Sequence, residues 1–213
     1  MDTRSTILEA AVRVFSQHGF RGSTTRRIAD AASVNEVTIF RYFGSKQALL
    51  QEAIRGSDVN AFSSPLPAVP KDPAHELTQW CTAVINHLHS RSSVIRKCMG
   101  EMEERPELSG QATEAPIRAT NELCSYFRRL RSKGFTEEEF DPSVASAMLI
   151  GSLFHDAMGR DMMPDAYPKP ASKAPGKYAQ FILRALGVRD AQPGSSPKPA
   201  KKPLTLPRRQ GPI

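Results

Sequence analysis

Apolar residues recur at intervals of three or four positions through most of residues 3–188, and polar residues fill the positions between them. This spacing puts the apolar side chains on one face of a helix, whereas a half-buried β-strand alternates apolar and polar residues. No strand-like alternation competes with it. We therefore predict an all-α fold, with amphipathic helices around these stretches: 7–15, 28–32, 39–43, 77–88, 94–102, 123–130, 144–158 and 178–186.

The most distinctive pattern lies at residues 24–50, where two short helices separated by a tight turn are followed at once by a third. Thr24 is a favourable cap for the first helix and Asn35 for the second, because their side chains can accept a backbone N–H at a helix start. Gly44 ends the second helix and Ser45 caps the third. Such a helix-turn-helix holds its second helix in a position to enter the major groove of DNA. The segment therefore predicts a DNA-binding unit.

The second of these helices runs from residue 36 to about residue 43. Its apolar residues, three or four positions apart, are expected to pack inward: Ile39, Phe40 and Phe43. The other side chains stay available for the groove and the DNA backbone: Glu36, Val37, Thr38, Arg41 and Tyr42.

Residues 24–50, TTRRIADAASVNEVTIFRYFGSKQALL, resemble the TetR family of one-component transcriptional regulators over an ungapped run of 27 positions. The shared features are a capped Thr-Thr helix, an Ile-Ala pair, a turn around Val34, a recognition helix that ends in an aromatic pair, and a Ser-Lys-x-x-Leu entry to the next helix. The first helix, with its break at Gly19 and Phe20, resembles the helix that braces the family's DNA reader. The resemblance covers residues 3–50, and the remainder resembles the family only as a series of helices.

Three positions depart from the family pattern. Ser33 stands where the family usually has Gly, so a positive φ angle there would bring some strain. Phe40 stands where Tyr is frequent, which removes a hydroxyl that could bind phosphate and leaves more of that role to Tyr42. Glu36 repels phosphate, but its carboxylate could accept a hydrogen bond from a cytosine amino group and so contribute specificity.

The resemblance implies a homodimeric, ligand-responsive repressor with no catalytic activity and no cofactor. It implies a helix-turn-helix DNA-binding domain at residues 1–50 and a helical effector-binding and dimerisation domain at residues 51–188. Two readers related by a two-fold axis would bind a palindromic operator in double-stranded DNA, and a small, largely apolar effector would release them. A second hypothesis is a small-molecule-binding or protein-interaction module on the same scaffold with a degenerate DNA reader.

Spacing and the family match together assign the expected DNA contacts. Phosphate contacts are expected from Thr25, Tyr42 and Lys46. Base contacts are expected from Arg26, Glu36, Val37 and Thr38. Arg41 is a further candidate for binding DNA.

The resemblance also implies a pocket between helices of the second domain, where an effector changes the spacing of the two readers. Met side chains are flexible and aromatic rings are broad, so both suit an adaptable apolar cavity. The candidate lining residues are Trp80, Val84, Met99, Met102, Phe127, Met148 and Phe154. The alternative for each is an ordinary place in the core, because core residues share the same helical spacing.

The helix predicted at residues 142–160 carries apolar residues on two sides. Val144 and Met148 lie on one side and Leu153 on another, so this helix must bury surface in two directions. In the family, the last two long helices pair with their copies in a second subunit. This helix and the one at 174–187 suit such a four-helix homodimer interface, and the alternative is that both complete the core of a monomer.

The formal net charge is +7, and its distribution decides what it means. Residues 1–55 hold eight basic and five acidic residues, residues 56–188 hold fifteen and sixteen, and residues 189–213 hold six and one. The middle of the chain therefore has no electrostatic reason to bind nucleic acid. The last segment alternates Pro with Lys and Arg, cannot bury a core and is predicted to be disordered. Weak nonspecific attraction to DNA and an inert solubilising role both stay open for this tail.

No pattern of catalytic or metal-binding residues stands out. His87 and His89 point about 200° apart on a helix and cannot chelate together. His155 and Asp156 accompany no His-Glu-x-x-His motif and no nucleophile elbow, so ordinary polar side chains explain them. We expect neither an enzyme nor a metal site.

The three cysteines, Cys81, Cys98 and Cys124, lie far apart in apolar helical patterns, which predicts core packing rather than a redox switch. The acidic run at residues 101–104 is expected to be a solvated helix end. No apolar run approaches the ~18 residues of a membrane span, and the chain begins with a polar, capped helix in place of a signal peptide. We therefore expect a cytoplasmic protein that does not enter a membrane.

Overall fold

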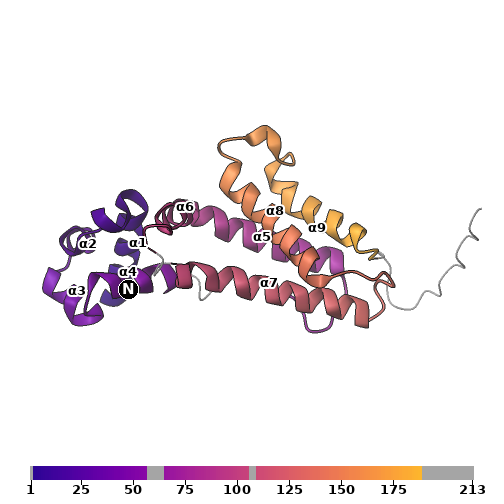
Figure 1. Cartoon of the computed structure of the whole chain (residues 1–213), viewed down its shortest axis with the longest axis horizontal. Coiled ribbons are helices and arrows are strands. Elements are labelled where there is room, and N and C mark those ends of the chain that lie inside the picture. The colour runs from indigo at the N-terminus through magenta and orange to yellow at the C-terminus, as the bar shows by residue number, and fades with distance from the viewer. Residues whose placement is uncertain (1, 57–64, 106–108, 189–213) are drawn as a thin grey trace, which may run out of the picture.

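The computed structural model describes residues 2–56, 65–105 and 109–188, and every regular element within these ranges is a helix. The all-α prediction is therefore confirmed. The predicted tail at 189–213 lies outside the described residues. Figure 1 shows an elongated molecule with the first four helices at one end and the later helices at the other.

The N-terminal end consists of four helices around one small apolar core. The helices are α1 (Thr3–Gly22), α2 (Thr25–Ala32), α3 (Glu36–Phe43) and α4 (Lys46–Gly56). All four contribute fully buried side chains to this core, among them Ile7, Phe15, Ile28, Ile39, Leu49 and Leu50.

Side-chain caps set the starts of α2, α3 and α4, as the sequence predicts. Thr24 Oγ1 accepts the backbone N–H of Arg27 at 3.2 Å, and Asn35 Oδ1 accepts that of Val37 at 2.9 Å. Ser45 caps α4 in the same way. Because a cap of this kind contributes ~1 kcal/mol, these three side chains fix where each helix begins and how α2 leads into α3.

Residues with positive φ angles separate or break the helices of this end. Ser33 closes α2 in a left-handed conformation, with φ 54° and ψ 42°, so the strain expected at this non-glycine position is present. Gly44, with φ 72°, ends α3. Gly19, with φ 66°, interrupts α1 where the sequence predicts a break.

The later helices form the longer part of the molecule. They are α5 (Pro73–Ser90), α6 (Ser92–Glu101), α7 (Ser109–Ser132), α8 (Pro142–Gly159) and α9 (Ala174–Ala185), with short 3-10 turns η2 (Pro164–Ala166) and η3 (Ala171–Lys173) before α9. In Figure 1, α5 and α7 run lengthwise away from the N-terminal helices, and α8 and α9 pack against them. The second core holds the largest buried side chains of this part, including Trp80, Leu123, Tyr126, Phe127 and Leu153.

The helix α6 belongs to both halves of the molecule. Its residues Val94 and Cys98 are buried in the N-terminal core, although α6 follows α5 in sequence. A movement of α6 therefore acts directly on the helices that carry α3. The predicted domain boundary at residue 50 falls inside α4, and the division of the chain into domains stays a prediction.

The prediction that Phe40 packs inward is wrong. The sequence predicts Phe40 to be buried beside Ile39 and Phe43, yet 47% of its surface is exposed while those two are buried. Successive residues on a helix point about 100° apart, so a short helix that buries Ile39 and Phe43 turns Phe40 toward the edge of the contact.

Within the described residues, no helix is both long and apolar enough to cross a bilayer.

Candidate functional site

The outer side of α3 is the exposed face that the sequence predicts for DNA contact. Val37 is 71% exposed and Arg41 is exposed beside it, while Thr38 is half-buried. The guanidinium of Arg41 lies 5.4 Å from the centre of the Tyr42 ring, so the two side chains form a cationic and aromatic pair on the surface. The buried Ile39 anchors the helix from behind.

Two further site residues bind each other. The Thr25 hydroxyl donates a hydrogen bond to the Glu36 carboxylate, which joins the first residue of α2 to the first residue of α3. Both side chains are half-buried, whereas Arg26 next to them is exposed. The bond fixes α3 relative to α2. It also engages the Glu36 carboxylate within the protein, so Glu36 has to leave or share this bond to contact a base.

Lys46 is also engaged within the protein. Its Nζ donates to the Phe20 carbonyl oxygen at 3.0 Å and lies 4.3 Å from the centre of the Phe20 ring. Desolvation by burial, followed by the nearby Arg105 charge, lowers the pKa of Lys46, and Glu101 partly offsets this. A phosphate contact from Lys46 therefore requires its ammonium to share or leave the Phe20 carbonyl.

The break in α1 is bound to the end of α6. The backbone N–H of Phe20 donates to both carboxylate oxygens of Glu101, at 2.9 and 3.1 Å, and the Arg105 guanidinium lies 3.9 Å from the centre of the Phe20 ring. Glu101 is half-buried, so the acidic run is not entirely the solvated helix end that was expected. Only Glu103 and Glu104 of this run are exposed. The hydrogen bond between Phe20 and Glu101 thus connects residues that are 81 positions apart in the chain.

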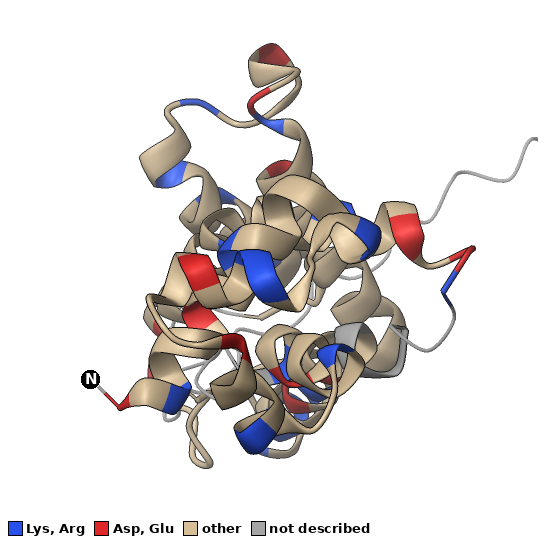
Figure 2. Ribbon diagram, turned by 90° about the vertical axis from the view of Figure 1, so that its left-hand side faces the viewer, with Lys and Arg blue, Asp and Glu red and all other residues tan. Residues whose placement is uncertain are grey.

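Figure 2 looks at the N-terminal end and shows basic ribbon segments interspersed with acidic ones. The end is therefore not a uniformly positive surface, in agreement with the small basic excess of residues 1–55. Specific placement of a few basic side chains, rather than a broad positive field, has to orient a nucleic acid here.

A cavity of about 300 Å³ lies between the two cores. It is walled by the end of α4 and by α5, α6, α7 and α8, and its lining residues are Ile54, Val84, His87, Leu88, Arg91, Val94, Ile95, Cys98, Met99, Met102, Ala115, Pro116, Ala119, Ile150 and Phe154. Most of this lining is apolar, which suits a small organic ligand.

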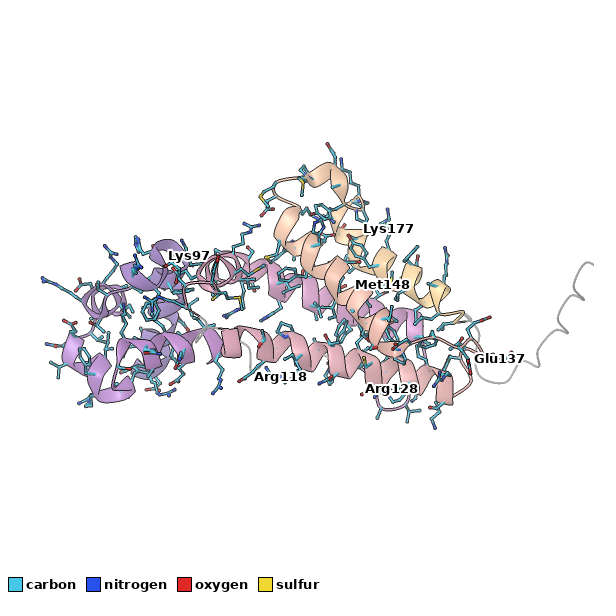
Figure 3. All side chains as sticks on the ribbon, viewed as in Figure 1. Lys97, Arg118, Arg128, Glu137, Met148 and Lys177 are labelled. Atoms are coloured by element: carbon cyan, nitrogen blue, oxygen red, sulfur yellow. The ribbon has the colours of Figure 1, made fainter. Side chains whose placement is uncertain are left out.

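The structure brings four of the seven predicted pocket residues to this cavity: Val84, Met99, Met102 and Phe154. The other three lie elsewhere. Trp80 and Phe127 are buried in the second core, and the Trp80 indole N–H is 3.4 Å from a Glu122 oxygen. Met148 points outward from α8 and is 57% exposed (Figure 3). Helical spacing alone does not separate these three environments.

Two polar residues of the cavity were missed by the sequence analysis. His87 is half-buried in the cavity wall, and Arg91, between α5 and α6, is only 9% exposed. The Arg91 guanidinium donates to the backbone carbonyl of Ile54 at 3.0 Å. Arg91 stands in a polar stretch outside the apolar stripes, so no periodic signal marks it as a buried residue.

The remaining polar candidates are engaged in the end of α8. Asp156 is fully buried, pairs with Arg160 and accepts the Tyr178 hydroxyl at 2.8 Å. His155 lies 3.2 Å from the Tyr167 hydroxyl. Burial, followed by the Asp156 carboxylate, raises the pKa of Tyr178. These contacts hold the segment between α8 and α9 in place. Among the described residues, no three or more His, Cys, Asp or Glu side chains gather in a group that could hold a metal ion.

All three cysteines are buried, as the sequence analysis expects. Burial raises the pKa of the Cys81 thiol, which disfavours the reactive thiolate. Cys98 differs from the other two because it lines the cavity.

The outer side of α8 and α9 exposes apolar side chains. Val144 and Met148 of α8 and Phe181 of α9 are all more than half exposed, and Phe181 reaches 69%. The opposite side of α8 buries Leu149 and Leu153 in the second core. The helix is thus apolar on two sides, as its sequence predicts.

A search with protein-family models finds the family described as "Bacterial regulatory proteins, tetR family" at residues 7–53. Among curated proteins, the chain is 28% identical over 156 residues to the uncharacterized HTH-type transcriptional regulator YvkB of Bacillus subtilis (strain 168), covering 72% of this chain and 82% of the relative. Over 47 residues it is 49% identical to the HTH-type transcriptional repressor NicS of Pseudomonas putida, covering 22% of each chain.

Solved structures show the same fold over nearly the whole described chain. SmeT, the repressor of the Stenotrophomonas maltophilia multidrug efflux pump SmeDEF, superposes with a TM-score of 0.67 at 23% identity, covering 94% of this chain and 98% of SmeT. GusR of Salmonella enterica superposes with a TM-score of 0.67 at 21% identity, covering 87% and 95%. The similarity thus includes the later helices as well as the N-terminal helix-turn-helix.

Proposed function

Since this chain belongs to the TetR family of DNA-binding transcriptional regulators, we propose that it represses transcription as a homodimer on an inverted-repeat operator. A small molecule in the cavity releases it from the DNA. The exposed outer side of α3 carries the proposal: α3 is capped at both ends, anchored by Ile39 and Phe43, and presents Val37 and Arg41 to the exterior.

The strongest DNA contacts in this proposal come from the side chains that α3 leaves free. Val37 and Thr38 approach base edges, Arg41 and Tyr42 approach the groove and its phosphates, and Arg26 of α2 supplies a further basic contact. Thr25, Glu36 and Lys46 stay candidates for contact, but each has to give up or share an internal hydrogen bond to reach DNA. Their contribution to affinity is therefore smaller than their position suggests.

Dimerisation through α8 and α9 is the second part of the proposal. Val144, Met148 and Phe181 are exposed apolar side chains of the kind that a partner helix pair buries. A two-fold axis beside these two helices gives the dimer two copies of α3. Two readers bind half-sites about one helical turn apart, which compensates for the few base contacts that one short helix can make.

Repression and ligand response are supported by similar proteins. NicS is named as a repressor, SmeT is described as the repressor of an efflux pump, and the regulator FadR of Bacillus subtilis has been solved in complex with stearoyl-CoA. The cavity of this chain lies between α4 and the later helices, where a bound molecule can change the position of the reader.

Selection of bound fragments from random DNA by the full-length protein tests the proposal. We expect an inverted repeat whose half-sites are about one helical turn apart, bound by a dimer. Failure to bind DNA at low salt by a folded dimer would instead favour a ligand-binding module with a degenerate reader. Recovery of a single half-site by a monomer would contradict the dimeric part.

A further inference from the structure

Phe20 lies between two charged side chains that come from α6 and α4. Its N–H donates to both carboxylate oxygens of Glu101, at 2.9 and 3.1 Å, and its carbonyl oxygen accepts the ammonium of Lys46 at 3.0 Å. Glu101 is the last residue of α6 and Lys46 is the first residue of α4. Only Gly44 and Ser45 separate Lys46 from α3. The position of Lys46, beside the recognition helix, therefore depends on a backbone segment that α6 holds.

The backbone before Phe20 leaves room for this carboxylate. Gly19, with φ 66°, turns the chain out of the helical conformation immediately before Phe20. A Cβ atom at position 19 would overlap the Glu101 carboxylate, so a residue with a side chain could not occupy this position without displacing it. Phe20 itself is only 8% exposed. Both the conformation and the open space at Gly19 thus keep the Glu101 carboxylate on the Phe20 N–H.

The Lys46 ammonium can bind the Phe20 carbonyl and a phosphate at the same time. An ammonium has three N–H donors, and the bond to Phe20 uses one of them. The Nζ atom also lies 4.3 Å from the centre of the Phe20 ring, so two contacts with Phe20 fix where the charge is. Burial, followed by the nearby Arg105 charge, lowers the pKa of Lys46, and the Glu101 carboxylate opposes this. A flexible side chain that is held in advance loses less entropy when it binds a phosphate.

We propose that Glu101 is a positioning residue for DNA binding: by holding the backbone of Phe20, it keeps the Lys46 ammonium where it meets a phosphate of the operator. This inference rests on the proposed function. The charge of Glu101 has the wrong sign for a phosphate contact, so its effect is exerted through Phe20 and Lys46. In sequence, Glu101 lies between Met99 and Met102, which line the cavity. A DNA contact of the reader thus depends on a helix of the cavity wall.

Operator affinities of two Glu101 variants of the full-length protein separate the hydrogen bond from the charge. Glu101→Ala removes the acceptor of the Phe20 N–H, and we expect binding about three- to tenfold weaker because the Lys46 ammonium is no longer held in place. Glu101→Gln removes the same charge but keeps an amide oxygen as acceptor, and its affinity should stay within about twofold of the wild type. Glu103→Ala removes an exposed carboxylate two residues away and is the matched control, with an unchanged affinity expected.

The comparison can overturn the proposal in two ways. Unchanged or tighter binding by Glu101→Ala would show that Glu101 does not position a DNA contact, and that its charge at most repels the phosphates. A loss of affinity as large in Glu101→Gln as in Glu101→Ala would show that the hydrogen bond to Phe20 is not the cause.

Combination with Lys46→Ala shows whether Glu101 acts through Lys46. We expect Glu101→Ala to cause no further loss of affinity in a protein that already lacks the Lys46 side chain, because the two residues contribute through one contact. Losses that add in the double variant would overturn the proposal and limit Glu101 to the stability of the fold.

Hydrogen exchange of the Phe20 amide tests the same coupling without a change at Glu101. Coupling between two contacts is reciprocal, so a phosphate on Lys46 should stabilise the bond from Phe20 to Glu101. We expect this amide to exchange about three- to tenfold more slowly when the operator saturates the wild-type protein, as measured by NMR, and no such slowing in operator-bound Lys46→Ala. Equal rates in free and bound wild type, or slowing that persists in Lys46→Ala, would overturn the proposal. This measurement decides if the Glu101 variants do not fold.

The wild-type protein separates this inference from the proposed function. A folded wild-type dimer that binds no DNA would refute the proposed function, and the inference with it. Operator binding by the wild type that does not change in Glu101→Ala would refute the inference alone.

Discussion

At the scale of single residues, Phe20 is one of the points where the two halves of the chain are joined. Gly19 breaks α1 immediately before it, and helix breaks leave backbone groups without helical partners. Side chains from two other helices bind these groups: Glu101 accepts the Phe20 N–H, and Lys46 donates to the Phe20 carbonyl. One residue thus connects α1, α4 and the end of α6.

Glu101→Ala should lower the free energy of unfolding by about 1–3 kcal/mol, because it leaves the partly buried N–H of Phe20 without its acceptor. Urea denaturation measures the effect. Glu104→Ala is the matched control, since its exposed carboxylate only approaches Arg21 at 3.6 Å, and its change should stay within about 0.5 kcal/mol. Equal effects of the two substitutions would contradict the assigned role of Glu101.

Lys46→Ala should weaken operator binding almost equally on all DNA sequences and reduce the slope of log affinity against log salt by about 0.9, if Lys46 binds one phosphate as proposed. Binding assays across a salt series measure the slope. Lys133→Ala removes the same charge at the far end of α7 and should leave the slope unchanged. An unchanged slope together with lower stability would show that Lys46 only binds the Phe20 carbonyl and contacts no phosphate.

At the scale of helices, α8 and α9 combine two different faces. Leu149 and Leu153 of α8 bind it to the second core, while Val144 and Met148 on its other side are exposed, as is Phe181 of α9. A helix with a single function in a monomer would need only the first face. The second face is the basis of the proposed dimer.

Phe181→Glu should shift the protein from dimer to monomer and strongly weaken binding to an inverted repeat, because it places a charge in the proposed apolar contact. Analytical ultracentrifugation and gel-shift assays measure the two effects. Ile117→Glu makes the same change at an exposed apolar position of α7 and should keep the dimer. A Phe181→Glu variant that remains dimeric would place the interface elsewhere.

At the scale of the whole molecule, the cavity lies where the two cores meet. Val94 and Cys98 of the N-terminal core line it together with Val84 and Ala119 of the second core. A molecule bound here touches both cores at once. Its binding can therefore change how the two cores sit relative to each other. It does so only if the molecule binds one arrangement of the cores more tightly than another.

Ala115→Phe should prevent release from the operator by a small-molecule effector without reducing operator affinity, because the added ring fills part of the cavity. Gel shifts with and without a molecule that releases the wild-type protein measure this. Ile117→Phe adds volume on the exposed side of the same helix and should keep the response. Release of the Ala115→Phe variant at the same effector concentration would show that this cavity is not the effector site.

The helices, their caps and the turn residues could be predicted from the sequence because they depend on residues close together in the chain. Thr24, Asn35 and Ser45 bind N–H groups two or three residues ahead, and Ser33 occupies the left-handed position that its place in the motif implies. The two-sided pattern of α8 is likewise a local property. These features follow from helix geometry whatever the rest of the molecule does.

The tertiary structure decided which side chains meet. Phe20 and Glu101 are 81 positions apart, and Arg91 and Ile54 are 37 apart, so no local pattern could pair them. The helical spacing predicts that Trp80 faces inward, and Trp80 is buried. The spacing does not distinguish a side chain in the core from one that lines a cavity. The sequence by itself determined the helices and the motif that carries the family, because those interactions are short-range. Only the folded chain determined the cavity, its buried cation and its bond to α4, because those depend on how the helices pack.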